Sequence, residues 1–492
     1  MLAPWAIEEM KTAELNDKRL NDRLTKLASA LGAMPRASIP AACGGHTEMT
    51  AAYRFFKNPK VTVDKILRSH IDQSLLRIAL QKVVVLVQDT TEIDVTRPEQ
   101  QMVGTGPMDG SDRRGFFVHL LHAFSPDGTP LGTVGHELWA REEDVRALTA
   151  EEKREERKAA PIEDKESYRW VKSLQQSREI AQSFPEVQCL CVADSEADIY
   201  EVFAEPRGAT PVHWLVRACQ DRSATPASGT ISAENSQLLR GIVSANPVLF
   251  TQPVSIRGRK AKTSCETRGR RQPRTSRDAV MEVRSATVTL RPPYRPDGKL
   301  APVTVNVVQV REVNVPEGDE PVEWLLVTTL PIDTEEQIRL VVQYYTVRWG
   351  IEVFFRTLKS GCRVEGRLFE HKDRFLPCLA LYLIVTWRIL YVCHMGRSCP
   401  EMDCEAIFEP SEWKSVWTVV KGTPLPKKNP HLQELIKLIA QLGGYVNLPN
   451  RQDPPGAQTI WLGMQRMHDL ALAWDAFGPG ATKSTKNRVV LV

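Results

Sequence analysis

The stretch "YYTVRWGIEVFFRTLKSG", Tyr344–Gly361, decides how the rest of the chain is interpreted. Its many apolar residues predict a helix, yet four polar side chains recur at steps of 3, 4 and 7: Tyr345, Arg348, Glu352 and Lys359. At about 100° per residue, these positions stay within roughly a 60° arc of one helix face. Such a stripe is either a solvated face with an i,i+4 ion pair or a functional surface that could hold DNA phosphates.

Two further acids follow apolar runs that are typical of buried strands. Val83–Val87 is wholly apolar and leads to Asp89, and the run "VQCLCVA" ends at Asp194. Carboxylates at strand ends of an open α/β sheet converge on the crevice where ligands bind. Clustered carboxylates repel one another unless a cation neutralises them, and hard oxygen ligands favour Mg²⁺ or Mn²⁺. We therefore expect Asp89, Asp194 and Glu352 to bind two such ions, about 3.5–4 Å apart, for phosphoryl transfer.

The composition is that of an ordinary soluble protein with several domains. The chain has 492 residues, and its net charge of +4 neither demands nor excludes a nucleic-acid partner. Met1–Trp5 lacks the features of a secretory signal, so we expect a cytoplasmic protein with reduced cysteines. The apolar run Phe375–Met395 is near the length of a membrane span but contains Pro377, Arg388 and His394. A buried helix and no membrane partner are expected.

Changes in residue pattern divide the chain into segments of different character. The predicted segments are a helical DNA-binding domain at 1–75, the first part of an α/β catalytic core at 76–220, a β-rich insertion at 221–321, the second part of the core at 322–395, and a helical C-terminal domain at 396–492. A solvated helical cap remains an alternative for the first segment. The basic run 257–274 in the insertion is interpreted as a contact with DNA phosphates rather than a solvated loop.

Several motifs resemble those of the IS-four family of bacterial DDE transposases, which includes the Tn-five transposase. The opening stretch is similar to the family's Tyr–Arg–Glu–Lys signature, with all four residues at the family spacing. "VQDTTEID" and "CVADSEADIYEVF" resemble its two aspartate motifs, and "VEWLLVTTLPI" resembles the strand before its glutamate helix. "AAYRFFKNP" is similar to a stretch near its N-terminal domain. Gly350 departs from the charged residue often found there, and indicates a slight bend or a close approach of DNA.

The resemblance implies an α/β fold with an RNase H-like core, in which helices flank a mixed sheet. The implied metal and catalytic triad falls on Asp89, Asp194 and Glu352, with two Mg²⁺ ions that Mn²⁺ would replace. The implied DNA contacts fall on Tyr345, Arg348, Lys359, Arg217 and Trp324. The family counterpart of Trp324 stacks on a base flipped out of the transposon end, because an extruded base loses its stacking partners. Without the resemblance, a core aromatic on a buried strand would be preferred for Trp324.

The implied activity is cut-and-paste transposition of DNA. The protein would bind the terminal inverted repeats, cleave the transposon ends by metal-dependent hydrolysis and hairpin formation, and join the 3′-hydroxyl ends to target DNA. The implied partners are double-stranded DNA, at the transposon ends and the target, and a second copy of the chain in a synaptic complex paired through the C-terminal helices. The implied location is the bacterial cytoplasm, on the nucleoid when the protein acts.

Two other functions and two other metal ligands remain open from the sequence. An RNase H-like nuclease would cut without joining, and a DNA-binding regulator would occupy the ends without cutting. The complete signature and Trp324 favour a transposase over a nuclease, and the intact triad disfavours a regulator. Glu196 and Asp198 lie beside Asp194 in "DSEAD" and are alternative metal ligands, but Asp194 is favoured because it directly ends the predicted strand.

Overall fold

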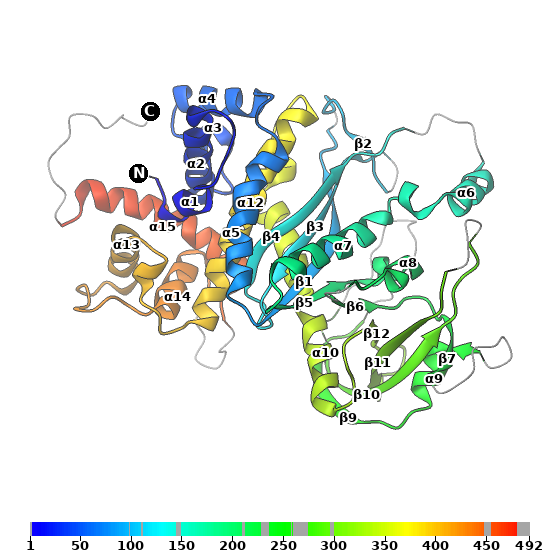
Figure 1. The fold of residues 1–492 in the computed structure, drawn as a ribbon. Helices are drawn as coiled ribbons and strands as arrows, with labels where there is room; N and C mark the ends of the chain where they lie inside the picture. The colour runs from blue at the N-terminus through cyan, green and yellow to red at the C-terminus, as the bar shows by residue number, and fades with distance from the viewer. Residues whose placement is uncertain are drawn as a thin grey trace.

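In the computed structural model, the chain folds around one long mixed sheet, and helices pack on both faces of this sheet (Figure 1). The described residues are 2–97, 99–109, 112–143, 149–208, 212–227, 236–256, 258, 274–295, 300–446 and 454–479. Most of the basic run 257–274 therefore lies outside the described residues, so its predicted contact with DNA stays a prediction.

The N-terminal part is helical, as the sequence predicts. Its helices are α1 (Pro4–Glu9), α2 (Lys18–Ala33), α3 (Ile39–Cys43), α4 (His46–Lys57) and α5 (Val63–Ala79). The side chains of Asp17 and Thr62 accept backbone hydrogen bonds from the first turns of α2 and α5, which satisfies donors that have no partner inside the helix. The leucines of α2 face the core, and α5 packs against the sheet at β4.

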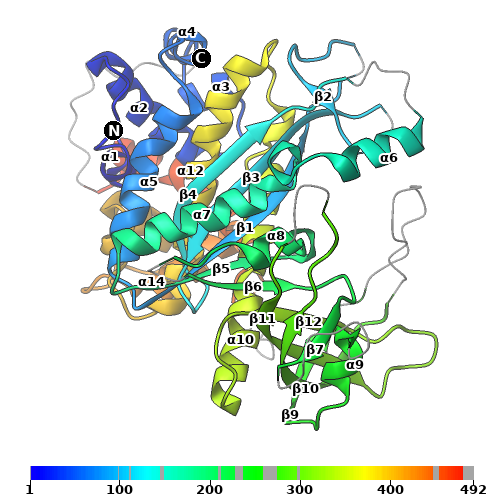
Figure 2. The same cartoon turned by 45° about the vertical axis from the view of Figure 1, so that its right-hand side comes forward.

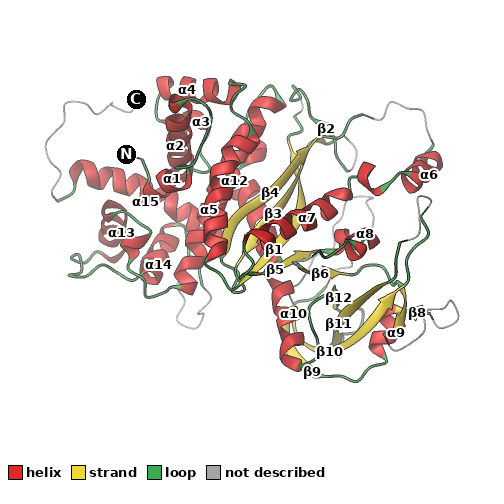
Figure 3. Cartoon of the chain, viewed as in Figure 1, coloured by secondary structure: helices red, strands yellow, loops and turns green. Residues whose placement is uncertain are grey.

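The described strands form one sheet in the order β2-β3-β1-β5-β6-β12-β11-β10-β7-β8, with β4 beside β3 and β9 beside β10 (Figure 3). The central strands β1, β5 and β6 pair in parallel, whereas β3 and β4 form an antiparallel hairpin next to β1. The bounds are β1 (Val83–Asp94), β2 (Gly106–Pro107), β3 (Arg114–Phe124), β4 (Pro130–Trp139), β5 (Gln188–Ala193), β6 (His213–Arg217), β7 (Ser223–Pro226), β8 (Gln237–Leu238), β9 (Phe250–Ile256), β10 (Arg277–Leu290), β11 (Val303–Val313) and β12 (Glu323–Thr328).

Both faces of the central strands are covered, which explains why β1 begins with an unbroken apolar run. Val85 and Val87 join one hydrophobic core, while Val84 and Leu86 join the core on the opposite face. The helices α6 (Ala150–Ala159), α7 (Tyr168–Ser183), α8 (Tyr200–Ala204) and α9 (Leu239–Ser244) follow the strands, and α7 and α8 supply the second core. The helices α10 (Glu335–Val347) and α11 (Trp349–Arg356) contribute side chains to the hydrophobic core that contains Val85 and Val87.

The predicted β-rich insertion is confirmed between β6 and β12. The long strands β10 and β11 pair along most of their length and extend the sheet away from the central strands (Figure 2). β11 pairs with β12, and β12 pairs antiparallel with β6, so the insertion continues the central sheet instead of forming a separate one.

The long helix α12 (Lys372–Ser398) is the one described helix that is long and apolar enough to cross a membrane, and 89% of its apolar window is buried inside the protein. It contacts α2, α4 and α5 of the N-terminal part, β4 of the sheet, and α14 and α15 of the C-terminal part. The C-terminal helices are α13 (Pro410–Lys421), α14 (Leu432–Leu442) and α15 (Ala457–Phe477). The predicted buried helix is therefore confirmed, and its side chains serve as the common core of three segments.

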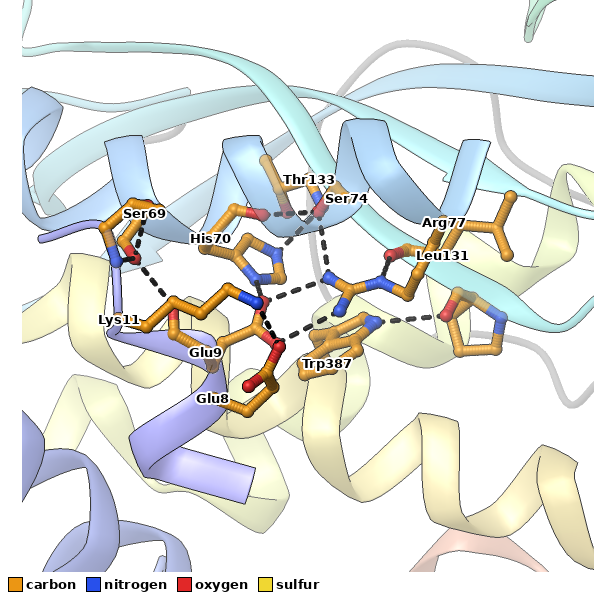
Figure 4. A network of polar contacts seen from close by, with 12 residues as sticks. Glu8, Glu9, Lys11, Ser69, His70, Ser74, Arg77, Leu131, Thr133 and Trp387 are labelled. Atoms are coloured by element: carbon orange, nitrogen blue, oxygen red, sulfur yellow. Dashed lines mark hydrogen bonds and ion pairs between the residues drawn. The ribbon is translucent and has the colours of Figure 1, made fainter. Parts of the chain in front are cut away.

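A buried polar network fixes α1 against α5, β4 and α12 (Figure 4). His70 Nδ1 donates to Glu9 Oε1 at 2.5 Å, and the Arg77 guanidinium donates to both Glu9 carboxylate oxygens at 3.1 and 3.0 Å. The backbone N–H of Thr133 donates to His70 Nε2 at 3.0 Å, so this imidazole is neutral. Arg77 also lies 4.2 Å from the Trp387 ring centroid. Every carboxylate oxygen of Glu9 thus has a charged or polar donor.

Candidate active site

Asp89 and Asp194 come from the adjacent parallel strands β1 and β5, as expected from their flanking apolar runs. Asp194 follows directly after β5 and caps a short 3₁₀ turn, Ser195–Ala197, where its Oδ1 accepts the Glu196 N–H at 2.8 Å. Asp89 does not end its strand, contrary to the expectation, because β1 continues to Asp94 through pairing with β3. The apolar run stops at Val87, but the backbone pairing of β1 with β3 continues to Asp94.

The carboxylate of Asp89 is poorly neutralised. Burial, followed by the nearby charge of Asp194, raises the pKa of Asp89 to about 7, and the charge of Arg348 offsets this only in part. Its Oδ1 accepts the Thr90 N–H at 2.8 Å. Repulsion between two partly buried carboxylates destabilises their ionised forms, so the binding of a cation between them is favourable.

Arg348 lies between the acids that the sequence assigns to one metal site. Its Nη2 is 2.5 Å from Glu352 Oε1 and its Nη1 is 3.7 Å from Asp89 Oδ2. The Arg348 side chain is 5% exposed, whereas that of Glu352 is 56% exposed. Among the described residues, no three Asp, Glu, His or Cys side chains lie close enough together to hold one ion. The hard carboxylate oxygens of Asp89 and Asp194 fit a divalent cation, and Glu352 would join them only by leaving Arg348.

The two alternative ligands beside Asp194 are already committed to other partners. The buried carboxylate of Asp198 accepts the N–H groups of Cys219 and Gln220, each at 2.8 Å, and pairs with Arg222 at 2.8 Å. Glu196 pairs with Arg169 at 3.1 Å. Asp198 therefore anchors the loop after β6, and Asp194 retains the freer carboxylate.

Three of the predicted DNA-contact residues line the same region. Tyr345 is buried, its ring centroid lies 5.8 Å from that of Trp324, and burial raises the pKa of its phenol. Arg217, at the end of β6, donates to the Ser195 hydroxyl at 3.1 Å. Trp324 on β12 is mostly buried, and the half-exposed Trp349 meets it edge-on at 5.4 Å. Among the described residues, the Tyr345 hydroxyl and Arg348 Nε have no hydrogen-bond partner.

Lys359 lies apart from the other residues of the stripe. The helix is not regular here: α10 and α11 meet at Arg348, and Thr357–Gly361 forms a π-helical turn. Lys359 Nζ is 3.8 Å from Glu365, whose Oε1 accepts the N–H of Asp94 at 3.1 Å. Asp94 is five residues beyond Asp89, about 17 Å along an extended strand. The sequence predicted one straight stripe, and the π turn redirects its last member.

Gly350 has a packing reason that neither sequence hypothesis contained. A Cβ at this position would lie 2.7 Å from the Phe124 ring, so the glycine allows α11 to approach β3 closely. One helix ends and the next begins at Arg348, two residues before Gly350. The group that approaches Gly350 closely is the Phe124 side chain of β3.

Sequence reasoning missed Arg169, which lies on α7 behind the two aspartates. Its Nε donates to the Thr90 hydroxyl at 2.9 Å, and its Nη2 pairs with Glu196. The motif "SYRW" carries no spacing signal for this role, because its partners come from β1 and the turn after β5. Only the three-dimensional arrangement brings them together.

Comparison with protein families covers all three parts of this architecture. Residues 2–61 match the family model described as transposase DNA-binding, residues 170–383 match transposase DDE domain, and residues 384–473 match Transposase Tn5 dimerisation domain. The core with helices on both faces of a mixed sheet is RNase H-like, as expected. Among solved structures, a piggyBac transposase synaptic complex with hairpin DNA is similar with a TM-score of 0.35 and 9% identity, over 92% of this chain and 79% of that one. That score is too low to carry an argument.

The three family matches follow one another in the order DNA-binding, catalytic and dimerisation. These matches identify the protein as a DNA transposase that uses a divalent metal. Its partners are DNA and a second copy of the chain. The chain belongs to the DDE transposases of the Tn5 and IS4 type.

Proposed function

We propose that this transposase works by the cut-and-paste route, with Asp89, Asp194 and Glu352 as the metal-binding catalytic triad. The observation that carries the proposal is the pair of aspartates at β1 and at the end of β5, where burial and then the charge of Asp194 raise the pKa of Asp89 to about 7. A site with such uncompensated negative charge favours divalent cations. Mg²⁺ is the proposed ion, two per active site, with Mn²⁺ as a substitute, because hard oxygen ligands suit both.

A pair of bound ions would supply Lewis-acid activation of the attacking oxygen and charge stabilisation of the leaving oxygen. Arg348 holds Glu352 and faces Asp89, so it keeps these carboxylates in place by charge before a cation arrives. If Glu352 were to bind a cation in place of Arg348, the guanidinium would be free to contact a DNA phosphate, for which its planar fork is suited.

The proposed DNA contacts are Tyr345, Arg348, Lys359, Arg217 and Trp324. Two donors without partners among the described residues, the Tyr345 hydroxyl and Arg348 Nε, support this, because a buried donor without an acceptor is costly and a phosphate oxygen would satisfy it. Trp324 would stack on a base extruded from the transposon end once Trp349 moves aside. Lys359, near Asp94, would hold a phosphate farther along the strand.

The proposed sequence of steps uses one active site repeatedly. Water first cleaves one strand at each transposon end, and the freed 3′-hydroxyl attacks the opposite strand to form a hairpin. A second water opens the hairpin, and the same 3′-hydroxyl then attacks target DNA. Each step is an in-line displacement at phosphorus, so the same carboxylates serve all of them.

We also propose how the parts of the chain divide the work. Residues 1–75 would bind the terminal inverted repeats, 76–220 and 322–395 would form the catalytic core around the 221–321 insertion, and 396–492 would pair two copies in the synaptic complex. The family matches for DNA binding and dimerisation support the first and last assignments. The proposed location is the bacterial cytoplasm, on the nucleoid during transposition.

The test is a cleavage and joining assay on DNA that carries the ends of the element encoding this protein. The protein and Glu352→Ala would be incubated with Mg²⁺, with Ca²⁺ or without metal. We expect nicks, hairpins and joined products only for the unmutated protein with Mg²⁺, while both proteins bind the ends. End binding without cleavage by the unmutated protein would support the regulator instead, and nicks without joined products would support the nuclease.

A further inference from the structure

We infer that Arg169 is a positioning residue that sets the spacing of Asp89 and Asp194, and thereby the affinity of the catalytic site for its divalent cation. The inference rests on the proposed catalytic role of these two aspartates. Arg169 belongs to neither the signature helix nor the aspartate motifs, and it lies on α7, on the opposite face of the sheet from α10 and α11.

The first half of the argument is the link from Arg169 to the Asp89 strand. Arg169 Nε donates to the Thr90 hydroxyl at 2.9 Å, and Thr90 directly follows Asp89 in β1. Because successive side chains of a strand point to opposite faces, Thr90 faces α7 while Asp89 faces the helices that carry Glu352. The Thr90 hydroxyl also shares a hydrogen bond with His119 Nδ1 at 2.9 Å, and His119 Nε2 shares one with the Ser173 hydroxyl at 3.0 Å. Thr90 is thus held by polar contacts from both Arg169 and His119.

The second half is the link from Arg169 to Asp194. Arg169 Nη2 donates to Glu196 Oε2 at 3.1 Å. Glu196 belongs to the 3₁₀ turn that Asp194 caps, and its N–H donates to Asp194 Oδ1 at 2.8 Å. One guanidinium therefore connects the side chain of Thr90, the residue after Asp89, with the turn that orients the Asp194 carboxylate.

Arg169 is held rigidly enough to transmit such a constraint. Its side chain is 12% exposed and lies between two indole rings, with Trp139 and Trp170 centroids at 5.5 and 5.2 Å. Its Nη1 donates to the backbone carbonyl of Glu166 at 2.7 Å. All three nitrogens of the fork thus have a partner on a different element or turn, and lysine could not satisfy them together.

The physical consequence concerns metal affinity more than DNA binding. Two carboxylates that must share cations lose affinity when their separation is no longer fixed, and partners of metal ligands typically contribute about 10–100-fold to affinity or activity. By charge alone, loss of Arg169 would leave Glu196 unpaired and would favour a cation. The expected weakening of cation binding therefore comes from the lost positioning of the two aspartates, and the DNA-facing side remains unchanged.

The experiment compares Arg169→Met with Arg178→Met in the full-length protein. Arg178 lies on the same helix, is 17% exposed and pairs with Glu205 and the Pro206 carbonyl, but contacts neither aspartate strand. We expect Arg169→Met to raise the Mg²⁺ concentration for half-maximal end cleavage by about tenfold or more. Mn²⁺ affinity, measured by electron paramagnetic resonance without DNA, should fall in parallel. Arg178→Met should match the unmutated protein in both, and metal-free end binding should be equal in all three.

Two further variants keep the inference testable if Arg169→Met folds poorly. Thr90→Val removes only the hydroxyl link and should shift the half-maximal Mg²⁺ concentration in the same direction by less. Arg169→Lys keeps the charge and should recover part of the Mn²⁺ affinity. Equal Mg²⁺ and Mn²⁺ responses in Arg169→Met and Arg178→Met, or weaker end binding with unchanged metal dependence, would overturn the inference. Absence of metal-dependent cleavage in the unmutated protein would instead refute the proposed function.

Discussion

The cluster of charged side chains around Glu9 and the cluster around Asp89 are balanced in opposite ways. In the network around Glu9, His70 and Arg77 donate to both carboxylate oxygens. Burial alone would raise the pKa of Glu9, but the hydrogen bond from His70 and the charge of Arg77 bring it below the ordinary value. Around Asp89, burial and Asp194 raise the pKa to about 7 despite Arg348. The first carboxylate is fully neutralised within the chain, whereas Arg348 only partly neutralises the acids of the second cluster.

The difference separates a structural cluster from a functional one. The Glu9 carboxylate is satisfied by His70 and Arg77, which themselves contact β4 and α12. The surplus negative charge at Asp89 and Asp194 is left to be neutralised from outside, which is typical of catalytic carboxylates. Residue types alone do not distinguish the clusters, because both contain acids and arginine.

The largest expected effect is on catalysis and falls on one cluster only. Asp194→Asn should reduce Mg²⁺-dependent end cleavage by at least about 10³-fold, since metal-supplied stabilisation of the transition state is worth several kcal/mol. Glu9→Gln, the matched change in the other cluster, should leave the rate per folded molecule unchanged. Single-turnover cleavage of labelled end DNA measures both. Similar losses in the two variants would break the comparison.

The next effect is on stability without metal. A raised folded-state pKa means that ionised Asp89 destabilises the fold increasingly from pH 3.8, its ordinary value, to about 7, and fully above that. Asp89→Asn should therefore raise the melting temperature of the metal-free protein at pH 8. A tenfold change in proton affinity is about 1.4 kcal/mol, so the gain has an upper limit of roughly 4 kcal/mol. The gain should shrink toward pH 4 and disappear when Mg²⁺ is added to both proteins; a destabilised variant at pH 8 would argue against surplus charge.

The opposite result is expected for Glu9→Ala. Removing one partner of a buried pair typically costs about 3 kcal/mol, because Arg77 and His70 lose their acceptor. Since the folded-state pKa of Glu9 is lowered, the loss should be complete above pH 4.5 and shrink as the pH falls further. Denaturant unfolding at pH 7 and pH 4 tests this. A variant as stable as the unmutated protein at pH 7 would mean that the network is not structural.

The smallest effect concerns the helix that carries Glu352. Gly350→Ala should destabilise by about 1–3 kcal/mol, because the added methyl overlaps the Phe124 ring. Gly241→Ala is the control: this helical glycine has no neighbour within 4 Å, so alanine should stabilise α9 by about 0.5–1 kcal/mol. Thermal unfolding of the two variants distinguishes a packing requirement from ordinary helix propensity. Stabilisation by Gly350→Ala would show that α11 is not held against β3 by this contact.

Much of the fold could be predicted because its signals are local. The unbroken apolar run of β1 follows from burial on two faces, and the apolar character of α12 follows from burial on all sides. The strand that continues past Asp89 could not be predicted, since pairing with β3 and not hydrophobicity extends it. The π turn at Lys359 likewise has no sequence signal in the signature.

For the candidate site, motifs placed the residues but not their mutual contacts. The Arg348–Glu352 contact is the i,i+4 pair that the sequence offered as an alternative, but the approach of Arg348 to Asp89 was not predicted. The contact of Arg348 with DNA stays a prediction. The choice between Asp194, Glu196 and Asp198 depended on hydrogen bonds from residues 219–222 and Arg169, which are distant in sequence. Long-range polar partners of this kind follow from the fold and not from spacing.

The most direct test of the account is a calorimetric titration of Mn²⁺ into the protein without DNA at pH 7.5. Unmutated protein and Glu9→Gln should bind Mn²⁺ with the same affinity, because the Glu9 cluster is already neutralised. Asp89→Asn and Asp194→Asn should lose that binding. Equal Mn²⁺ binding by all four proteins would contradict the claim that the aspartates of β1 and β5 form the metal site of this transposase.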